Sequence, residues 1–204
     1  MKEKLIDVST WNGNIDWNKV YKSGVKYAMI RSSFGVENPN QIDNKFVRNI
    51  TNAVRAGVKC GVYHYSYAQS AFEAKREAEF CLKTIKGYKI DLPVAFDIED
   101  SSQTHLGKDT LTSIVIAFCD RIKSAGYRPM LYCNPNWLCN YLHKDKLINK
   151  YDIWLANWGV SAPSYNCAIW QYSENGSVPG VSGSVDMNWI YKDYILSLIH
   201  ISEP

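Results

Sequence analysis

The sequence lacks several features that would place it in a specialised class. Its first residues contain no apolar run of the roughly 7–15 residues that a signal peptide needs, and no run of about 18 apolar residues could span a membrane. Lys and Arg total 23 against 20 Asp and Glu, so the net charge of +3 is too small to indicate a nucleic-acid surface. We therefore expect no membrane span and no nucleic-acid partner, and a product that stays in the cytoplasm unless another route exports it.

The six cysteines form no C-x-x-C pair, so the sequence offers little support for a zinc site or a disulfide framework. Several of them lie inside predicted strands or helices, and we expect buried, reduced thiols. They are Cys60, Cys81, Cys119, Cys133, Cys139 and Cys167.

The composition is that of a soluble globular chain. Of the 204 residues, 46% are hydrophobic and 21% are charged, which excludes disorder, collagen and coiled coil. The length favours one large domain. Aromatic residues make up 13% of the chain, more than a core alone would explain. Rings with polar tips suit partly wet, partly apolar surfaces such as sugar-binding clefts.

Eight short apolar segments, rich in β-branched and aromatic residues, predict strands. The first gaps between them carry amphipathic helical patterns, whereas the gaps after residue 150 are short and rich in Gly, Ser and Pro. This order predicts a single closed TIM-like barrel of the (β/α)5(β)3 type. The predicted strands are Leu5–Ser9, Tyr27–Ser32, Lys59–Tyr65, Pro93–Ile98, Pro129–Cys133, Asp152–Ala156, Ala168–Tyr172 and Val185–Asn188.

Helix signals fall between these strands at regular places. We predict helices over Ile15–Ser23, Ala71–Ile85 and Thr110–Ala125, and a further helix that Asp43 caps and Gly57 ends. Glycines that suit a left-handed helix stop follow each of them. These are Gly24, Gly57, Gly87 and Gly126.

An apolar strand that ends in acid carries the strongest chemical signal. Asp97 and Glu99 lie two residues apart, so on a strand they share a face, with Cα atoms about 6.6–6.8 Å apart. Paired carboxyls, one protonated and one ionised, are what acid/base work on a glycosidic bond requires. Two alternatives are solvated turn residues and metal ligands of the D-x-E kind.

Two more acids fall at equivalent places near the chain ends. Asp7 closes the first predicted strand and Asp186 lies on the last. In a closed barrel these strands are neighbours, so both acids can meet while Asp97 and Glu99 approach from the opposite wall. Crowded carboxyls raise one another's pKa. We assign the resulting proton donor to Glu99, which lies farthest along its strand.

Aromatic and amide side chains surround the predicted mouth of the barrel. Because alternate residues share a face, Tyr63, Tyr65 and Tyr67 should lie together, and His64 should face the helices instead. Rings with Gln and Tyr hydrogen bonders suit a sugar, although interior packing would explain some of them equally well. The predicted substrate-binding residues are Tyr63, Tyr65, Trp154, Gln171 and Tyr172, with Trp158 nearby.

Six short motifs are distributed over residues 5–191. They are Asp7–Gly13, Ile15–Trp17, Gly61–Ala68, Asp97–Asp100, Trp170–Tyr172 and Val185–Asn188. Together they resemble glycoside hydrolase family 25, the Chalaropsis-type lysozymes of bacteria, fungi and phages. The resemblance implies hydrolysis of the β-1,4 bond between N-acetylmuramic acid and N-acetylglucosamine in peptidoglycan, without a metal or cofactor.

The resemblance also implies roles for the four acids. Glu99 becomes the general acid and Asp97 its partner, with Asp7 and Asp186 completing the acidic cluster. In one route the acetamido oxygen of the substrate attacks the anomeric carbon while Asp97 orients that group. In the other, Asp97 is itself the nucleophile, which would place its carboxyl roughly 5–5.5 Å from that of Glu99. The sequence leaves both open.

The family pattern ends after Tyr191. We therefore expect a catalytic domain over residues 1–193 and a non-native or disordered tail over 194–204. We expect a monomer that acts on glycan strands outside the cell, either as a phage endolysin released at lysis or as a secreted autolysin. Two other functions stay open at this point: a non-catalytic glycan-binding barrel, and a Mg²⁺-dependent phosphoesterase that uses the carboxylates as ligands.

Overall fold

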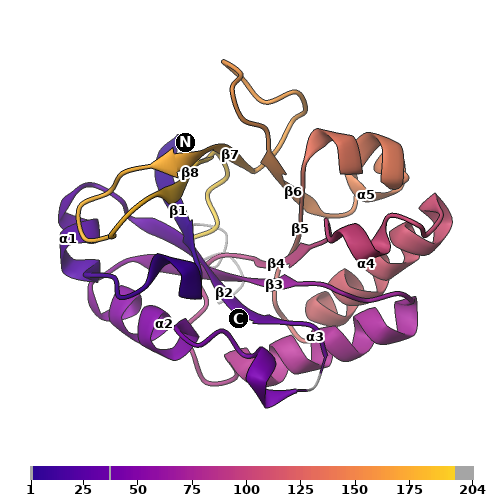
Figure 1. The fold of residues 1–204 in the computed structure, drawn as a ribbon, viewed down its shortest axis with the longest axis horizontal. Helices are drawn as coiled ribbons and strands as arrows, with labels where there is room; N and C mark the ends of the chain where they lie inside the picture. The colour runs from indigo at the N-terminus through magenta and orange to yellow at the C-terminus, as the bar shows by residue number, and fades with distance from the viewer. Residues whose placement is uncertain (1, 37, 196–204) are drawn as a thin grey trace, which may run out of the picture.

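The computed structural model describes residues 2–36 and 38–195 and shows a closed eight-stranded barrel (Figure 1). Strands β1 to β7 pair in sequence order and in parallel, and β8 closes the barrel antiparallel to both β7 and β1. The predicted fold is thereby confirmed. The strands are β1 Glu3–Val8, β2 Tyr27–Phe34, β3 Lys59–Tyr65, β4 Val94–Asp97, β5 Pro129–Cys133, β6 Asp152–Ala156, β7 Ile169–Gly176 and β8 Val185–Ile190.

Helices cover the barrel unevenly. The gaps from β1 to β6 each contain helix, whereas loops join β6 to β7 and β7 to β8 in the described chain, as predicted (Figure 1). None of the described helices combines the length and the hydrophobicity that a bilayer-spanning segment needs. The α-helices are α1 Trp17–Lys22, α2 Phe46–Arg55, α3 Ala71–Ile85, α4 Lys108–Ser124 and α5 Lys144–Leu147; the 3-10 turns are Thr10–Asn12, Pro39–Gln41 and Ser101–Gln103, and Trp137–Tyr141 is a π-helical turn.

One predicted helix cap is wrong. Helix α2 begins after Lys45 without a side-chain cap, and the Asp43 carboxylate accepts hydrogen bonds from the Arg31 Nε at 2.8 Å and the Thr10 N–H at 2.9 Å. The other oxygen, Asp43 Oδ1, accepts the backbone N–H of Lys45 at 2.9 Å, so the Asp43 carboxylate holds the turn ahead of α2 and does not cap the first turn of the helix. At the other end of α2, Gly57 does stop the helix, with φ of 92°.

Alternation along the strands sorts side chains into two apolar layers. One set packs between the strands and the helices, and the other fills the barrel interior. Asp7 shares the interior face with Leu5, and Asp97 shares it with Ala95. The interior cluster therefore forms an apolar floor, and the same alternation places the acids above it.

The packed domain extends beyond the predicted boundary by two described residues, Tyr194 and Ile195. Tyr194 is only 1% exposed within the interior cluster, and its carbonyl accepts a hydrogen bond from Arg128 Nη1 at 2.7 Å. The remainder of the predicted tail, residues 196–204, lies outside the described residues. All six cysteines are free thiols; five are buried as expected and Cys139 is half-buried.

Candidate active site

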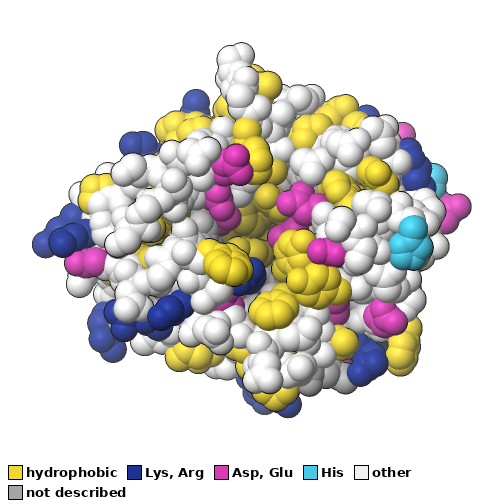
Figure 2. Space-filling view, in the orientation of Figure 1, with side chains coloured by type: hydrophobic (Ala, Val, Ile, Leu, Met, Phe, Trp, Pro, Cys, Tyr) yellow, Lys and Arg dark blue, Asp and Glu magenta, His cyan; other side chains and the backbone are white. Residues whose placement is uncertain are grey.

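A cavity of about 290 Å³ opens at the carboxyl ends of the strands. Figure 2 shows acidic side chains gathered around this hollow, with apolar side chains on its walls. Parallel β/α barrels place their active sites at this end. The lining residues are Asp7, Ser9, Trp11, Asn12, Arg31, Tyr63, Tyr65, Asp97, Tyr132, Trp154, Trp158, Gln171, Glu174 and Asp186.

Asp7 and Asp186 meet across the seam of the barrel. They are paired in the β1–β8 register, and their carboxyl groups are hydrogen-bonded. Asp7 Oδ2 also accepts hydrogen bonds from Gln171 Nε2 at 2.9 Å and Asn188 Nδ2 at 2.7 Å. Burial and the neighbouring charge of Asp7 raise the pKa of Asp186 to about 8. Burial also raises the pKa of Asp7, but the amide donors oppose this shift. The shared proton therefore belongs on Asp186.

Asp97 is a buried carboxyl whose Oδ1 has no hydrogen-bond partner among residues 2–36 and 38–195. Burial, followed by the charges of Glu99 and Asp7, raises its pKa well above the usual range, while Arg31 opposes the shift. Only 6% of Asp97 is exposed, and the residue lines the cavity. An unpaired carboxyl in such a place is free to bind a substrate group.

Glu99 follows β4, which ends at Asp97 and is shorter than predicted. The Glu99 side chain is half-buried, and its Oε2 accepts a hydrogen bond from Asn134 Nδ2 at 3.2 Å. Glu99 is not among the residues that line the cavity. Its charge nevertheless raises the pKa of Asp97 and of Tyr132, and both of these residues line the cavity. Burial raises the Glu99 pKa and the Asn134 donor lowers it. Asp97 and Glu99 thus form an interacting pair in which protonation of one favours ionisation of the other.

Gln171 links the acids to the aromatic wall. Its Nε2 donates to Asp7, while its Oε1 accepts hydrogen bonds from Tyr132 Oη and from Trp158 Nε1, both at 3.1 Å. Tyr132 lies on the floor, whereas Trp158 is 46% exposed. The amide therefore fixes the position of one exposed ring relative to the buried Asp7.

Comparison with known proteins identifies the group to which this site belongs. Residues 6–181 match the family model described as "Glycosyl hydrolases family 25". The chain belongs to this family. Among solved structures, the bacterial lysozyme from Streptomyces coelicolor superposes with a TM-score of 0.87 at 29% identity, and the match covers 100% of this chain and 99% of that one. The CTP1L endolysin gives a TM-score of 0.83 at 28% identity, covering 98% of this chain and 70% of its own.

Two curated proteins are similar to this family 25 chain in sequence. Lysozyme M1 of Streptomyces globisporus is 32% identical over an alignment of 197 positions, which covers 90% of this chain and 66% of that protein. The autolytic lysozyme of Clostridium acetobutylicum is 32% identical over an alignment of 190 positions, which covers 91% of this chain and 55% of that protein. The family 25 chain thus spans just under two thirds of the one relative and about half of the other.

The structure brings most of the predicted family 25 site residues together. Tyr63, Tyr65, Trp154 and Gln171 line the cavity, but Tyr172 does not. Its ring stacks on Trp189 at 5.6 Å, outside the barrel wall. Because strand residues alternate, Gln171 faces inward and its neighbour Tyr172 faces outward.

Several residues of the family 25 cavity were missed by the sequence analysis. Arg31 and Tyr132 line the cavity, whereas Asn188 is fully buried and donates to Asp7. These three residues lie two positions from Met29, Met130 and Asp186 on their strands, so alternation alone points them into the barrel. Trp11, Asn12 and Glu174 come from the loops and strand ends around the mouth. For these three, position along a strand gives no signal.

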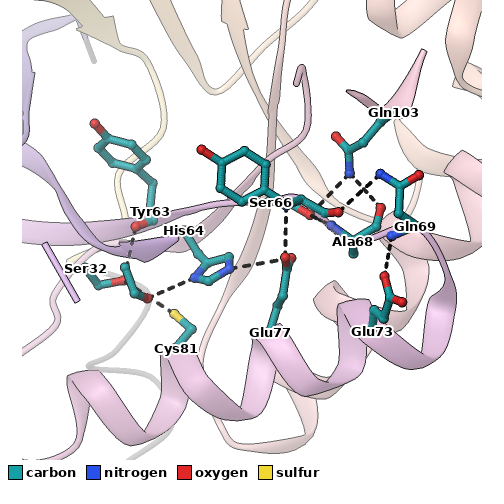
Figure 3. Close-up of polar contacts among 12 residues, drawn as sticks. Ser32, Tyr63, His64, Ser66, Ala68, Gln69, Glu73, Glu77, Cys81 and Gln103 are labelled. Carbon is teal, nitrogen blue, oxygen red and sulfur yellow. Dashed lines mark hydrogen bonds and ion pairs between the residues drawn. The ribbon is translucent and has the colours of Figure 1, made fainter. Parts of the chain in front are cut away.

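A buried polar network holds the end of β3 beside the family 25 cavity (Figure 3). His64 Nδ1 hydrogen-bonds with Ser33 Oγ at 2.9 Å, and His64 Nε2 lies 3.5 Å from Glu77 Oε2 on α3. Glu77 Oε1 accepts the backbone N–H of Tyr67 at 2.9 Å. His64 therefore faces the helices, as predicted, and Glu77 fixes the chain just after Tyr65.

Among the described residues, no group of three or more His, Cys, Asp or Glu side chains has the geometry to hold a metal ion. The four acids instead contact amides, each other or the open cavity.

Proposed function

We propose that the chain is a lysozyme that hydrolyses the β-1,4 bond between N-acetylmuramic acid and N-acetylglucosamine in peptidoglycan. The observation that carries the proposal is the unpaired, buried Asp97 carboxyl beside Glu99, at the cavity end of the barrel. Family membership supports it, as do the names of the relatives, which include two lysozymes and an endolysin.

In the proposed reaction Glu99 is the general acid. The pKa of both carboxyls is raised, by burial and, for Asp97, by the charge of Glu99, which favours retention of a proton by the pair. When the N–H of a substrate acetamido group donates to Asp97, it stabilises the Asp97 carboxylate and so favours the proton on Glu99. Glu99 can then protonate the glycosidic oxygen as the bond breaks.

The acetamido oxygen of the same sugar attacks the anomeric carbon in the route we favour. Asp97 orients this group and stabilises the positive charge that develops on it. Glu99, now ionised, then takes a proton from the water that opens the intermediate, so the anomeric configuration is retained. The absence of a partner on Asp97 Oδ1 supports this role, because a substrate N–H would satisfy that oxygen.

Asp7 and Asp186 support the pair from the opposite wall. Because Asp186 retains a proton and Gln171 and Asn188 donate to Asp7, the seam adds less negative charge than two free carboxylates would. We propose that this arrangement keeps the floor of the site compatible with an ionised Asp97. Action on cell walls, as an endolysin or an autolysin, belongs to the same proposal.

The test is release of reducing ends from purified peptidoglycan. We expect turnover by the unmodified protein, in EDTA as well as without it, and loss of turnover in Glu99→Gln with glycan binding retained. Glu3→Gln is the matched control, since Glu3 is exposed at the opposite end of β1. An unchanged rate in Glu99→Gln would reject the assignment of the acid.

A further inference from the structure

Among the described residues that line the cavity, Arg31 is the one Arg or Lys. Its side chain is 14% exposed and lies on β2. Asp7, Asp97, Glu174 and Asp186 line the same cavity, so its surroundings are acidic. Figure 2 shows dark-blue basic surface reaching the edge of the central hollow.

The guanidinium of Arg31 is held in place through one nitrogen only. Its Nε donates to Asp43 Oδ2 at 2.8 Å, and the guanidinium lies 5.5 Å from the centre of the Phe34 ring. Asp43 has a fully buried side chain and also accepts the backbone N–H groups of Thr10 and Lys45. Asp43 is therefore a rigid anchor, and it fixes the direction of the Arg31 fork.

The two terminal nitrogens of Arg31 make no hydrogen bond within the described chain, whereas its Nε does. A planar guanidinium with two outward N–H groups matches the two oxygens of a carboxylate. Burial strengthens such a contact, because water competes less for the donors. Arg31 thus provides a preorganised pair of hydrogen-bond donors for a carboxylate on one side of the cavity.

The proposed substrate carries such a group on one of its two sugars. N-acetylmuramic acid has a 3-O-lactyl carboxyl, free or in amide linkage to a peptide, and N-acetylglucosamine has none. The carboxylates that remain ionised disfavour an anionic sugar elsewhere in the cavity. A carboxyl-bearing sugar would therefore be accepted only in the orientation that places its carboxyl against Arg31.

We infer that Arg31 recognises the lactyl carboxyl of N-acetylmuramic acid and so determines which of the two sugars occupies the position next to Asp97. This inference rests on the proposed function for its substrate. Arg31 acts here as a specificity-determining residue, and Asp43 as the residue that positions it.

The experiment measures binding, so that it does not depend on turnover. Tetrasaccharides of alternating N-acetylglucosamine and N-acetylmuramic acid are prepared with free lactyl carboxyls, with the carboxyls reduced to alcohols, and with a short peptide in amide linkage. Their affinities are measured for Glu99→Gln alone and for Glu99→Gln combined with Arg31→Gln. Arg48→Gln in the same background is the matched control, since Arg48 is exposed on α2 outside the cavity.

We expect Glu99→Gln to bind the free carboxyl form about tenfold or more tightly than the alcohol form. The amide form, which keeps an acceptor but loses the charge, should fall between them. Arg31→Gln should abolish this preference, and Arg48→Gln should preserve it. Arg31→Lys keeps the charge but loses the fork, so it should retain only part of the preference; this variant also serves if Arg31→Gln does not fold.

Equal affinities for the three forms, or a preference that survives in both Arg31 variants, would overturn the inference. If Arg31 acted only through Asp97, substitution of Arg31 would lower the affinity for all three ligands equally. That result would also count against the inference. Failure of the proposed function is separate: it would be seen as intact peptidoglycan after incubation with the unmodified protein, whatever the binding preference.

Discussion

The carboxyl groups of Asp7 and Asp186 are hydrogen-bonded across the β1–β8 seam, between residues 179 positions apart in the chain that are partners in the strand register. Two buried acids in contact are stable only if they share a proton. Gln171 and Asn188 both donate to Asp7, so the structure itself decides which acid is ionised. Protonation of Asp186 therefore stabilises the pairing of β1 with β8, which closes the barrel.

Stability should fall as the pH rises through the titration of this pair. The folded-state pKa of Asp186 is raised to about 8 from the model-compound value of 3.8, so the folded state holds a proton that the unfolded chain releases. Stability is then lost progressively between about pH 4 and pH 8. Urea denaturation across this range measures it. Asp186→Asn mimics the protonated acid and should remove the part of this slope that Asp186 contributes.

At pH 9 we expect Asp186→Asn to be more stable than the unmodified protein, by on the order of 1–2 kcal/mol once solvent screening of a partly exposed group is allowed for. At pH 4 the two should be nearly equal. A variant that is less stable at both pH values would show that the pair does not share a proton as described.

The exposed ring of Trp11 should contribute to glycan binding without contributing to folding. Trp11 is 84% exposed at the cavity, and such a ring can stack on the apolar face of a sugar. Trp11→Ala should raise KM on soluble glycan strands about tenfold, with a melting temperature within a few degrees of the unmodified protein. Phe72→Ala is the control, since Phe72 is 71% exposed but does not line the cavity. Equal effects of the two substitutions would argue against a specific contact.

The contact between His64 and Glu77 should stabilise the fold rather than bind substrate. Glu77→Ala leaves the Tyr67 N–H without its acceptor in a buried place and removes the carboxylate that lies 3.5 Å from His64 Nε2, which costs about 1–3 kcal/mol. Chemical denaturation measures this loss. Glu79→Ala, two residues along α3 on the exposed surface, should change stability by less than about 1 kcal/mol. A small effect of Glu77→Ala would mean that the network is not needed to hold β3.

The sequence predicts the barrel well because its strands carry continuous apolar runs and its helices end at glycines such as Gly57 and Gly126. Alternation then places Asp7 and Asp97 inside. Strand alternation also places Tyr172 on the outer face of the barrel, and it places Arg31 and Asn188 on the inner face, where the structure has them. The contacts of Asp43 with Arg31 and Thr10 join segments that are distant in the sequence, and local patterns do not contain them.

The most direct test of the proposed lysozyme activity is the identity of the new reducing end. Peptidoglycan is digested with the protein, the products are reduced with borohydride, and the reduced amino sugars are identified by mass spectrometry. Cleavage as proposed places N-acetylmuramic acid at every new reducing end, so muramicitol should be the product and Glu99→Gln should give none. Glucosaminitol as the main product, or muramicitol formed equally by Glu99→Gln, would contradict the account.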